Sequence, residues 1–302
     1  MSERRFDPFT GRSIVLAPGR RGLGAAKPGG LPAPAGRCPF CPGHEADTEE
    51  TLARWPERGP WRVRVVRNKY PLASLPGGDH EVGIDDAAHD TDLDDLAPDH
   101  ALALWRVYRD RIAALSTRHR EVLFFRNRGR RAGSSQPHPH SQVVAIDWEP
   151  ADLAIRRERA RAHERERGVP LHAAELERER ASARVLWDDD ALLTHCPFAP
   201  TRPYEVRFVP TAPRGRFADA TDAELEALSR RVGDAVRRLK AVGVPDYNLI
   251  LRQVDAWWHL ELLPRTGGDA GFELSTGDMI VVVPPEDAAR ALRGVSPAAR
   301  RS

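Results

Sequence analysis

The residues best suited to chemistry lie together in the segment 133–142, which reads Gly-Ser-Ser-Gln-Pro-His-Pro-His-Ser-Gln. In an extended strand, residues i and i+2 share a face about 6.6 Å apart, so His138 and His140 can stand side by side. One imidazole could then be held by a metal while the other stays free for chemistry. Gly133 lets the backbone come close to a bound anion. The alternative is a proline-bent surface loop whose histidines are solvated.

The residues around this segment favour a functional site. An apolar run at 122–125 ends in Arg126-Asn127, and the basic stretch at 128–131 contains a glycine. A strand-like run follows at 143–146. The pattern predicts a strand, a basic glycine turn and a second strand. A hairpin that presents a nucleophile, an amide and positive charge suits a phosphate ester.

Cys38 and Cys41 form a Cys-Pro-Phe-Cys motif. Three cysteines cannot form a complete disulfide set, and in a reducing compartment this spacing indicates either a metal site or two reduced cysteines in a turn. A structural zinc site needs four nitrogen or sulfur ligands, and no second cysteine pair exists. His138 is the first candidate for a further ligand, because a metal there would immobilise the hairpin that presents His140. The candidates for the fourth ligand are His89, which we favour, His80, His44 and His100.

Composition excludes several classes of protein. The 302 residues carry 46 Lys and Arg against 44 Asp and Glu, a net charge of +2, so we expect no nucleic-acid partner. No apolar run reaches the roughly 18 residues that span a bilayer, and the first residues lack the apolar segment of a signal peptide. We therefore expect a cytoplasmic protein with no membrane partner. Cys196 is expected to be a small buried residue.

Two halves of the chain repeat one order of elements, namely cap, helix, strand and strand. The first half is predicted to hold a helix with apolar positions from Leu102 to Leu115 and strands at 61–66, 81–84, 121–126 and 142–146. The second half is predicted to hold a helix with apolar positions from Leu225 to Leu239 and strands at 184–187, 204–209, 247–252 and 258–262. Each half is therefore predicted to be a mostly antiparallel α+β unit.

The predicted organisation has three parts. Residues 1–150 form the first repeat with the metal site and nucleophile, 151–183 form a charged helical linker, and 184–302 form the second repeat. A surface loop is expected at 19–37 and a loose tail at 294–302.

The ordered set of motifs resembles the galactose-1-phosphate uridylyltransferases of the histidine-triad superfamily. The set comprises the Cys-x-x-Cys motif, a histidine before the first long helix, Asn127 and the segment 133–142. The stretches 4–11, 258–265 and 271–273 are similar to further parts of that family, so the match covers nearly the whole chain. The resemblance implies ping-pong nucleotidyl transfer on an α+β fold of two histidine-triad repeats that form one pseudo-symmetric unit.

The resemblance also implies roles for individual residues. The nucleophile of the family falls on His140. The ligands of its metal, zinc or possibly iron, fall on Cys38, Cys41, His138 and His89. The catalytic set further includes Gln142, which would hold a phosphoryl oxygen, and Ser135. The residues expected to bind substrate are Arg20, Asn68, Asn127, Gly133, Ser134, His259 and Phe272.

Some positions depart from the pattern of the family. The region 257–261 offers a single histidine, so a second metal site found in some members is expected to be absent or altered. A family arginine falls near Leu23 and a lysine of some members falls on Gly271, so recognition of the sugar phosphate is expected to differ. His259 is either a sugar or phosphate contact or a histidine of the core or an interface.

Three functions remain open from the sequence. The leading one is transfer of UMP between hexose 1-phosphates, with a nucleotide sugar and a sugar 1-phosphate as partners and a homodimer as the expected assembly. The second is a nucleotide-sugar or dinucleotide phosphorylase, in which inorganic phosphate replaces the sugar phosphate. The third is a zinc-stabilised nucleotide-binding protein without turnover, against which the presence of both His140 and Gln142 argues.

Overall fold

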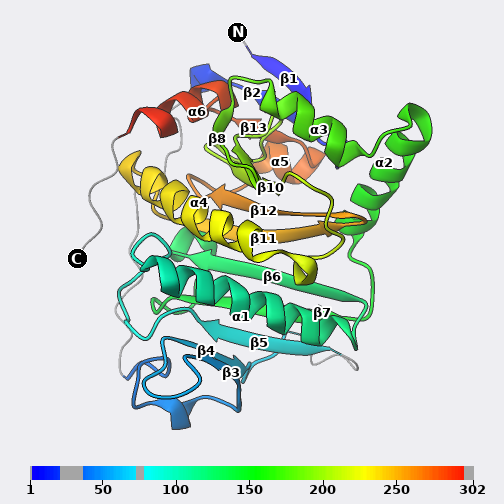
Figure 1. Cartoon of the computed structure of the whole chain (residues 1–302). Helices are drawn as coiled ribbons and strands as arrows, with labels where there is room; N and C mark the ends of the chain where they lie inside the picture. Colours follow the sequence, from blue (N-terminus) through cyan, green and yellow to red (C-terminus); the bar gives the residue numbers. More distant parts are fainter. Residues whose placement is uncertain (1, 21–36, 73–77, 296–302) are drawn as a thin grey trace.

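The computed structural model describes residues 2–20, 37–72 and 78–295 (Figure 1). Its main feature is one antiparallel sheet of ten strands. In chain order the strands are β3 (Thr51–Trp55), β4 (Val63–Arg67), β5 (Asp79–Ile84), β6 (Glu121–Arg128), β7 (His140–Ile146), β8 (Val185–Asp188), β9 (Leu192–His195), β10 (Val206–Pro210), β11 (Tyr247–Val254) and β12 (Trp257–Pro264). Across the sheet they run β3-β4-β5-β7-β6-β11-β12-β10-β9-β8. The predicted α+β class is confirmed.

The two halves of the sheet have the same topology and meet at β6 and β11. In the first half the order is β5-β7-β6, and in the second it is β10-β12-β11. Helix α1 (Pro98–Ser116) connects β5 to β6, and helix α4 (Asp222–Ala241) makes the same connection between β10 and β11. Figure 1 shows α1 and α4 side by side across one face of the sheet, which we call the helix face.

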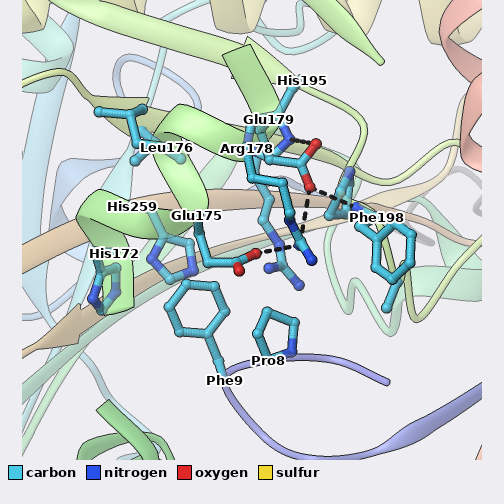
Figure 2. A pocket seen from close by; sticks show the side chains of 14 residues that line it. Pro8, Phe9, His172, Glu175, Leu176, Arg178, Glu179, His195, Phe198 and His259 are labelled. Atoms are coloured by element: carbon cyan, nitrogen blue, oxygen red, sulfur yellow. Dashed lines mark hydrogen bonds and ion pairs between the residues drawn. The ribbon is translucent and has the colours of Figure 1, made fainter. Parts of the chain in front are cut away.

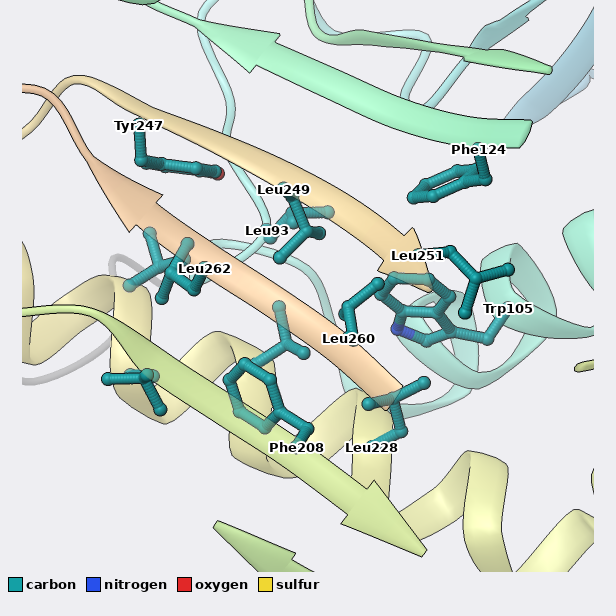
Figure 3. Close-up of a cluster of buried hydrophobic side chains, with 14 of the residues drawn as sticks. Leu93, Trp105, Phe124, Phe208, Leu228, Tyr247, Leu249, Leu251, Leu260 and Leu262 are labelled. Carbon is teal, nitrogen blue, oxygen red and sulfur yellow. The ribbon is translucent and has the colours of Figure 1, made fainter. Parts of the chain in front are cut away.

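Both helices form for reasons that the sequence displays. Thr221 caps α4, because its side chain accepts a hydrogen bond from the backbone N–H of Glu224 while the Glu224 carboxylate accepts one from the backbone N–H of Thr221. Apolar residues at i, i+3 and i+4 spacing give α1 and α4 one buried stripe each. These stripes meet the sheet in a single large core (Figure 3). In this core Trp105 packs against Phe124, and Phe217 packs against Trp258. Burial of each such side chain contributes about 1.5–3 kcal/mol.

The opposite face of the sheet, which we call the open face, is covered by two helices in its second half. Helices α2 (Ala151–Arg167) and α3 (Leu171–Arg180) lie between the two halves in sequence. Their apolar residues pack against the N-terminal segment and the open face of β9 to β12 in two small clusters. The same face of the first half carries the polar strand residues described below.

Several elements were not predicted from the sequence. A second, three-stranded sheet joins β1 (Glu3–Phe6), β2 (Ser13–Leu16) and β13 (Met279–Val281). Strands β3 and β9 and the helices α5 (Gly271–Thr276) and α6 (Pro285–Gly294) were also missed. Most of the surface loop expected at 19–37, and the tail beyond residue 295, lie outside the described residues. The domain bounds at 150 and 183 stay a prediction.

Candidate active site and metal centre

Four side chains from three separate segments come together beside the start of β7. The metal-ligating atoms of Cys38, Cys41, His89 and His138 all lie within 4.8 Å of one another. The Nδ1 atom of His138 is 3.7 Å from the Cys38 sulfur, 3.6 Å from the Cys41 sulfur and 3.3 Å from Nδ1 of His89. The Cys41 sulfur is 3.4 Å from Nδ1 of His89. Such a set of two thiols and two imidazoles could hold a metal ion.

The remaining histidine candidates for the fourth ligand have other partners. His44 directs Nδ1 to the backbone carbonyl of Cys38 at 2.6 Å. His100 lies within 2.9 Å of the Asp85 carbonyl. His138 itself uses its second ring nitrogen to donate to the Asp86 carbonyl oxygen at 2.8 Å. A ligand histidine fixed in this way keeps its other nitrogen aimed at the metal position.

His140 follows two residues later and presents its ring to a pocket. Its Nδ1 lies 2.9 Å from the carbonyl oxygen of His138. Because a carbonyl can only accept, Nδ1 carries the proton and Nε2 keeps a free lone pair. Burial lowers the pKa of His140 to about 4, so the ring is neutral at pH 7. The Phe40 ring, from between the two cysteines, lies 5.6 Å from that of His140 and closes one side.

The pocket has a volume of about 420 Å³, which is in the range of small-ligand sites. It lies on the open face of the first half. Apolar walls come from Val66, Val82 and Phe125. The polar predicted residues that line it are Asn68, Asn127, Ser135, His140 and Gln142.

Two neighbours to which the sequence analysis gave no such role hold these polar residues in place. Asn248 donates from its side-chain amide to Asn127 Oδ1 at 2.8 Å and to the Ala132 carbonyl at 2.8 Å. His80 Nε2 lies 2.8 Å from Gln142 Oε1. Each contact joins residues at least 60 positions apart in the chain, so spacing along the sequence gave no sign of it.

Gly133 and Ser134 form the turn that leads into the site. Gly133 has φ +79°, a left-handed conformation that favours glycine, and ends a short 3₁₀ helix at Arg130–Ala132. The hydroxyl of Ser134 donates to the Gln136 carbonyl at 2.7 Å and so closes the turn. Ser134 is buried, whereas Ser135 faces the pocket.

The structure does not bring the other three predicted substrate residues to this pocket within one chain. Arg20 is exposed at the end of a 3₁₀ helix (Pro18–Arg20), and Phe272 is exposed on α5. His259 lies on β12 in the second half and is only 2% exposed. Its Nε2 is 3.3 Å from Glu261 Oε1, which fits the alternative of a core histidine.

The strand order shows which strands of the two halves correspond, and β12 takes the place of β7. Phe125 and Ile250 face each other across the β6–β11 boundary. On β7 the partner of Phe125 is Gln142, and on β12 the partner of Ile250 is Glu261. Gln142 and Glu261 therefore lie on the same face of the sheet, on corresponding strands. His140 and His259 precede them by two residues and lie on that face too.

The equivalent region of the second half is closed and charged. Arg252 donates from Nε to Glu261 Oε2 at 2.9 Å, and Arg207 and Arg156 lie 3.8 and 3.6 Å from the other carboxylate oxygen. The adjacent cavity in Figure 2, beside Phe9 and α3, has a volume of about 20 Å³, room for about one water molecule. Its titratable lining residues are His172, Glu175, Arg178, Glu179, His195, Arg207 and His259.

Similarity to known proteins agrees with this geometry. The family model described as galactose-1-phosphate uridyl transferase, N-terminal domain, matches residues 64–150. The chain is 26% identical to the ADP-glucose phosphorylase of Arabidopsis thaliana, over 97% of this chain and 93% of that protein. It is 29% identical to the galactose-1-phosphate uridylyltransferase of Streptomyces lividans, over 69% of this chain and 56% of that one.

A solved structure is similar over the full length. The crystal structure of an ADP-glucose phosphorylase from Arabidopsis thaliana with bound ADP-glucose superposes with a TM-score of 0.87 at 26% identity, covering 98% of this chain and 100% of that chain.

In the part of this chain that the structure describes, no helix is both apolar enough and long enough to cross a bilayer.

Proposed function

Since the chain belongs to the galactose-1-phosphate uridylyltransferase family, we propose that it is a nucleotidyltransferase that moves UMP between hexose 1-phosphates, of the UDP-glucose plus galactose 1-phosphate type. The observation that carries this proposal is the neutral, buried His140, whose free Nε2 faces a pocket of about 420 Å³. Neutral imidazole is a competent nucleophile without a separate base.

In the first step, the Nε2 lone pair of His140 attacks the α-phosphorus of the nucleotide sugar. A phosphorus–nitrogen bond forms, and the bond between the α-phosphorus and the bridging oxygen breaks, so the hexose 1-phosphate leaves. The hydrogen bond from Nδ1 to the His138 carbonyl supports the positive charge that develops on the ring. In the second step, an oxygen of another sugar 1-phosphate attacks the same phosphorus and releases His140.

Donors around His140 would stabilise the phosphoryl oxygens in both steps. Gln142 lines the pocket two residues from His140 on the same strand, and Ser135 faces it from the preceding turn. Both side chains are neutral donors, which bind an anion without forming an ion pair with it. Asn127 and Asn68 supply further polar groups to the nucleotide side of the pocket.

We propose zinc for the four-residue cluster. Tetrahedral zinc with bonds of about 2.0–2.1 Å to nitrogen and about 2.3 Å to sulfur requires ligand atoms roughly 3.3–3.8 Å apart. Four of the six separations, at 3.3 to 3.7 Å, fit this requirement, and all six lie within 4.8 Å. Bound zinc would tie the Cys38–Cys41 loop to the strand that presents His140. Because Arg252 already pairs with the buried Glu261, we propose no metal in the second half.

Loss of the thiols tests the metal assignment. The double variant Cys38→Ser with Cys41→Ser is expected to lose about one equivalent of zinc per chain in elemental analysis and to melt at a lower temperature. Iron in place of zinc would correct the identity of the metal. Unchanged metal content would contradict the ligand set.

A second candidate function is favoured by one comparison. The similarity to ADP-glucose phosphorylase extends over almost the whole chain, and a structure with bound ADP-glucose superposes closely. In a phosphorylase the first step is unchanged, but inorganic phosphate takes the nucleotidyl group from His140 in the second step. The scaffold alone permits both reactions, since the acceptor changes and the nucleophile does not.

Product analysis separates the candidates. We expect incubation with UDP-glucose and galactose 1-phosphate to give UDP-galactose and glucose 1-phosphate. Rapid turnover of ADP-glucose with phosphate, without use of galactose 1-phosphate, would instead assign the phosphorylase. Binding of either nucleotide sugar with no release of glucose 1-phosphate would assign a non-catalytic binding protein.

We also propose a cytoplasmic homodimer. Arg20 and Phe272 are exposed at a distance from the His140 pocket of their own chain, as expected if they approach the pocket of a second copy. Light scattering on the purified protein should then give twice the chain mass of 33.6 kDa. A monomer at working concentrations would exclude this role for both residues.

A further inference from the structure

His80 is a buried histidine to which neither the metal centre nor the proposed chemistry assigns a role. It lies on β5, directly beside β7, and is 4% exposed. Its Nε2 is 2.8 Å from Gln142 Oε1, and its Nδ1 is 3.0 Å from the backbone nitrogen of Leu72. Both ring nitrogens therefore have defined partners.

The chemistry of these partners fixes the tautomer of His80. A backbone N–H can only donate, so Nδ1 must be the unprotonated acceptor of the bond from Leu72. A neutral imidazole then carries its proton on Nε2, and burial lowers the pKa of His80, which favours the neutral form. The group that receives the Nε2 proton must be an acceptor. Of the two ends of the Gln142 amide, only the carbonyl oxygen qualifies.

The same logic fixes the direction of the Gln142 side chain. An isolated glutamine amide can turn over and present either its oxygen or its nitrogen. With the oxygen held by His80, the NH₂ end is left for the pocket that Gln142 and His140 both line. Two N–H donors then point to the space that a phosphoryl group attached to His140 would occupy.

Asn68 supports the ring from a third direction. Its Oδ1 accepts a hydrogen bond from the backbone N–H of Tyr70 at 2.8 Å, so its amide nitrogen faces His80. In the assigned tautomer this amide can donate only to the unprotonated Nδ1, at 3.2 Å, and its approach to Nε2 at 3.0 Å is a contact between two donors. The backbone N–H of Asn68 donates to the His80 carbonyl at 2.8 Å. The segment after β4 thereby holds His80 on both its backbone and its side chain.

We propose that His80 is a positioning residue that orients Gln142 for phosphoryl binding. As a neutral Nε2–H donor it holds the carboxamide oxygen and directs the amide hydrogens at the phosphoryl oxygens. The proposal rests on the proposed function, because it assigns to Gln142 a role in the transfer from His140. It predicts that His80 acts through Gln142 and has little effect without it.

A double-mutant cycle tests this dependence. The rate at which a nucleotide sugar labels the protein is measured in a single turnover for the wild type, His80→Leu, Gln142→Ala and the double variant. We expect His80→Leu to slow labelling at least about tenfold, in line with the loss of an oriented donor, and His80→Gln, which retains a donor, to recover most of the rate. In the Gln142→Ala background, His80→Leu should change the rate less than about twofold.

The outcomes distinguish a failure of the positioning role of His80 from a failure of the proposed function. Equal losses from His80→Leu in both backgrounds would overturn the positioning role and leave the nucleophile intact. No labelling of the wild type would overturn the proposed function and the role of His80 with it. His163→Ala, which removes a histidine on α2 far from β5 in the sequence, serves as the control and should label at the wild-type rate.

A spectroscopic measurement on the unmodified chain covers the case in which His80→Leu fails to fold. In protein labelled with ¹⁵N-histidine, the resonances of His80, assigned by their loss in His80→Gln, should be those of a neutral ring protonated at Nε2. A ring protonated at Nδ1, or at both nitrogens at neutral pH, would overturn the proposal.

Discussion

His140 and His259 lie on the corresponding strands β7 and β12 of one sheet and on the same face, yet their surroundings differ in kind. In the first half, the neighbouring position holds the neutral Gln142, and the face is open to a pocket of about 420 Å³. In the second, it holds Glu261, paired with Arg252 and covered by α2 and α3, beside a cavity of about 20 Å³. The polar groups of the second half have one another as partners, whereas those of the first leave donors for a ligand.

The difference shows how one scaffold supports stability in one half and chemistry in the other. Buried charges require partners, and the second half supplies them with arginine and carboxylate side chains. On the helix face of the first half, Arg126 pairs with Asp85 and Asp92 beneath β7. On the open face, the pocket of His140 combines the neutral side chains of Asn127 and Gln142 with the charged Arg67 and Lys69.

Substitution of the proposed nucleophile should give the largest difference in activity between the two halves. His140→Asn removes the lone pair that attacks phosphorus, and we expect the transfer rate to fall by a factor on the order of 10⁴ or more. His259→Asn, on the corresponding strand of the second half, should retain covalent labelling and lower the melting temperature. Assays of glucose 1-phosphate release would measure the activity of both variants, and thermal melting would measure the stability of His259→Asn. Comparable activity losses in the two variants would remove the asymmetry.

Removal of one charge should affect the stability of the second half. Glu261→Gln leaves the buried Arg207 and Arg156 and the half-buried Arg252 with one carboxylate fewer, and we expect a loss of about 3–5 kcal/mol in the free energy of unfolding. Urea denaturation would measure the loss. An unchanged midpoint would show that Asp7 and Glu205, which also contact Arg207, neutralise the cluster unaided.

A glutamate in place of Gln142 in the first half should affect catalysis. Gln142→Glu introduces the residue of the second half beside His140, where a carboxylate repels the phosphoryl group. We expect labelling to slow by about 100-fold with a small change in melting temperature. The conservative control Gln142→Asn tests length without charge. Full activity of Gln142→Glu would argue that Gln142 does not contact phosphate.

Glu175, on α3 in the second half, gives the smallest expected effect. Burial raises the pKa of Glu175 from 4.5 to about 7, despite the nearby Arg178. A carboxyl group with a raised pKa binds more protons in the folded than in the unfolded state between these values. The contribution of Glu175 to stability should therefore fall by an amount on the order of 2 kcal/mol as the pH rises from about 4.5 to about 7. The difference in stability between the wild type and Glu175→Gln should show this slope in melting experiments, and a difference that does not change with pH would contradict the assignment.

The main elements of the fold could be predicted because each one has a local signal. Helices α1 and α4 show apolar residues at helical spacing, and their connected strands are apolar runs. The small sheet could not be predicted, because β1, β2 and β13 are three or four residues long and β13 pairs with β2 from more than 260 residues away. Short strands of this kind depend on tertiary partners.

The residues of the candidate site could likewise be predicted only in part. The Cys-x-x-Cys motif and the His-Pro-His segment indicated the candidate metal ligands and the proposed nucleophile, because cysteine and histidine are distinctive in a sequence. The roles of His80 and Asn248 were missed, since they depend on strand register between distant segments. His89 and His80 could not be separated by spacing alone, and the fold assigns them to different sites.

The most direct test of the central claim is the intact mass of the wild-type protein after incubation with a nucleotide sugar. The account predicts an added mass of one nucleoside monophosphate, carried by the peptide that contains His140 and absent from His140→Asn. It would be contradicted by a protein that releases sugar 1-phosphate with no covalent adduct, or by an adduct on any other residue.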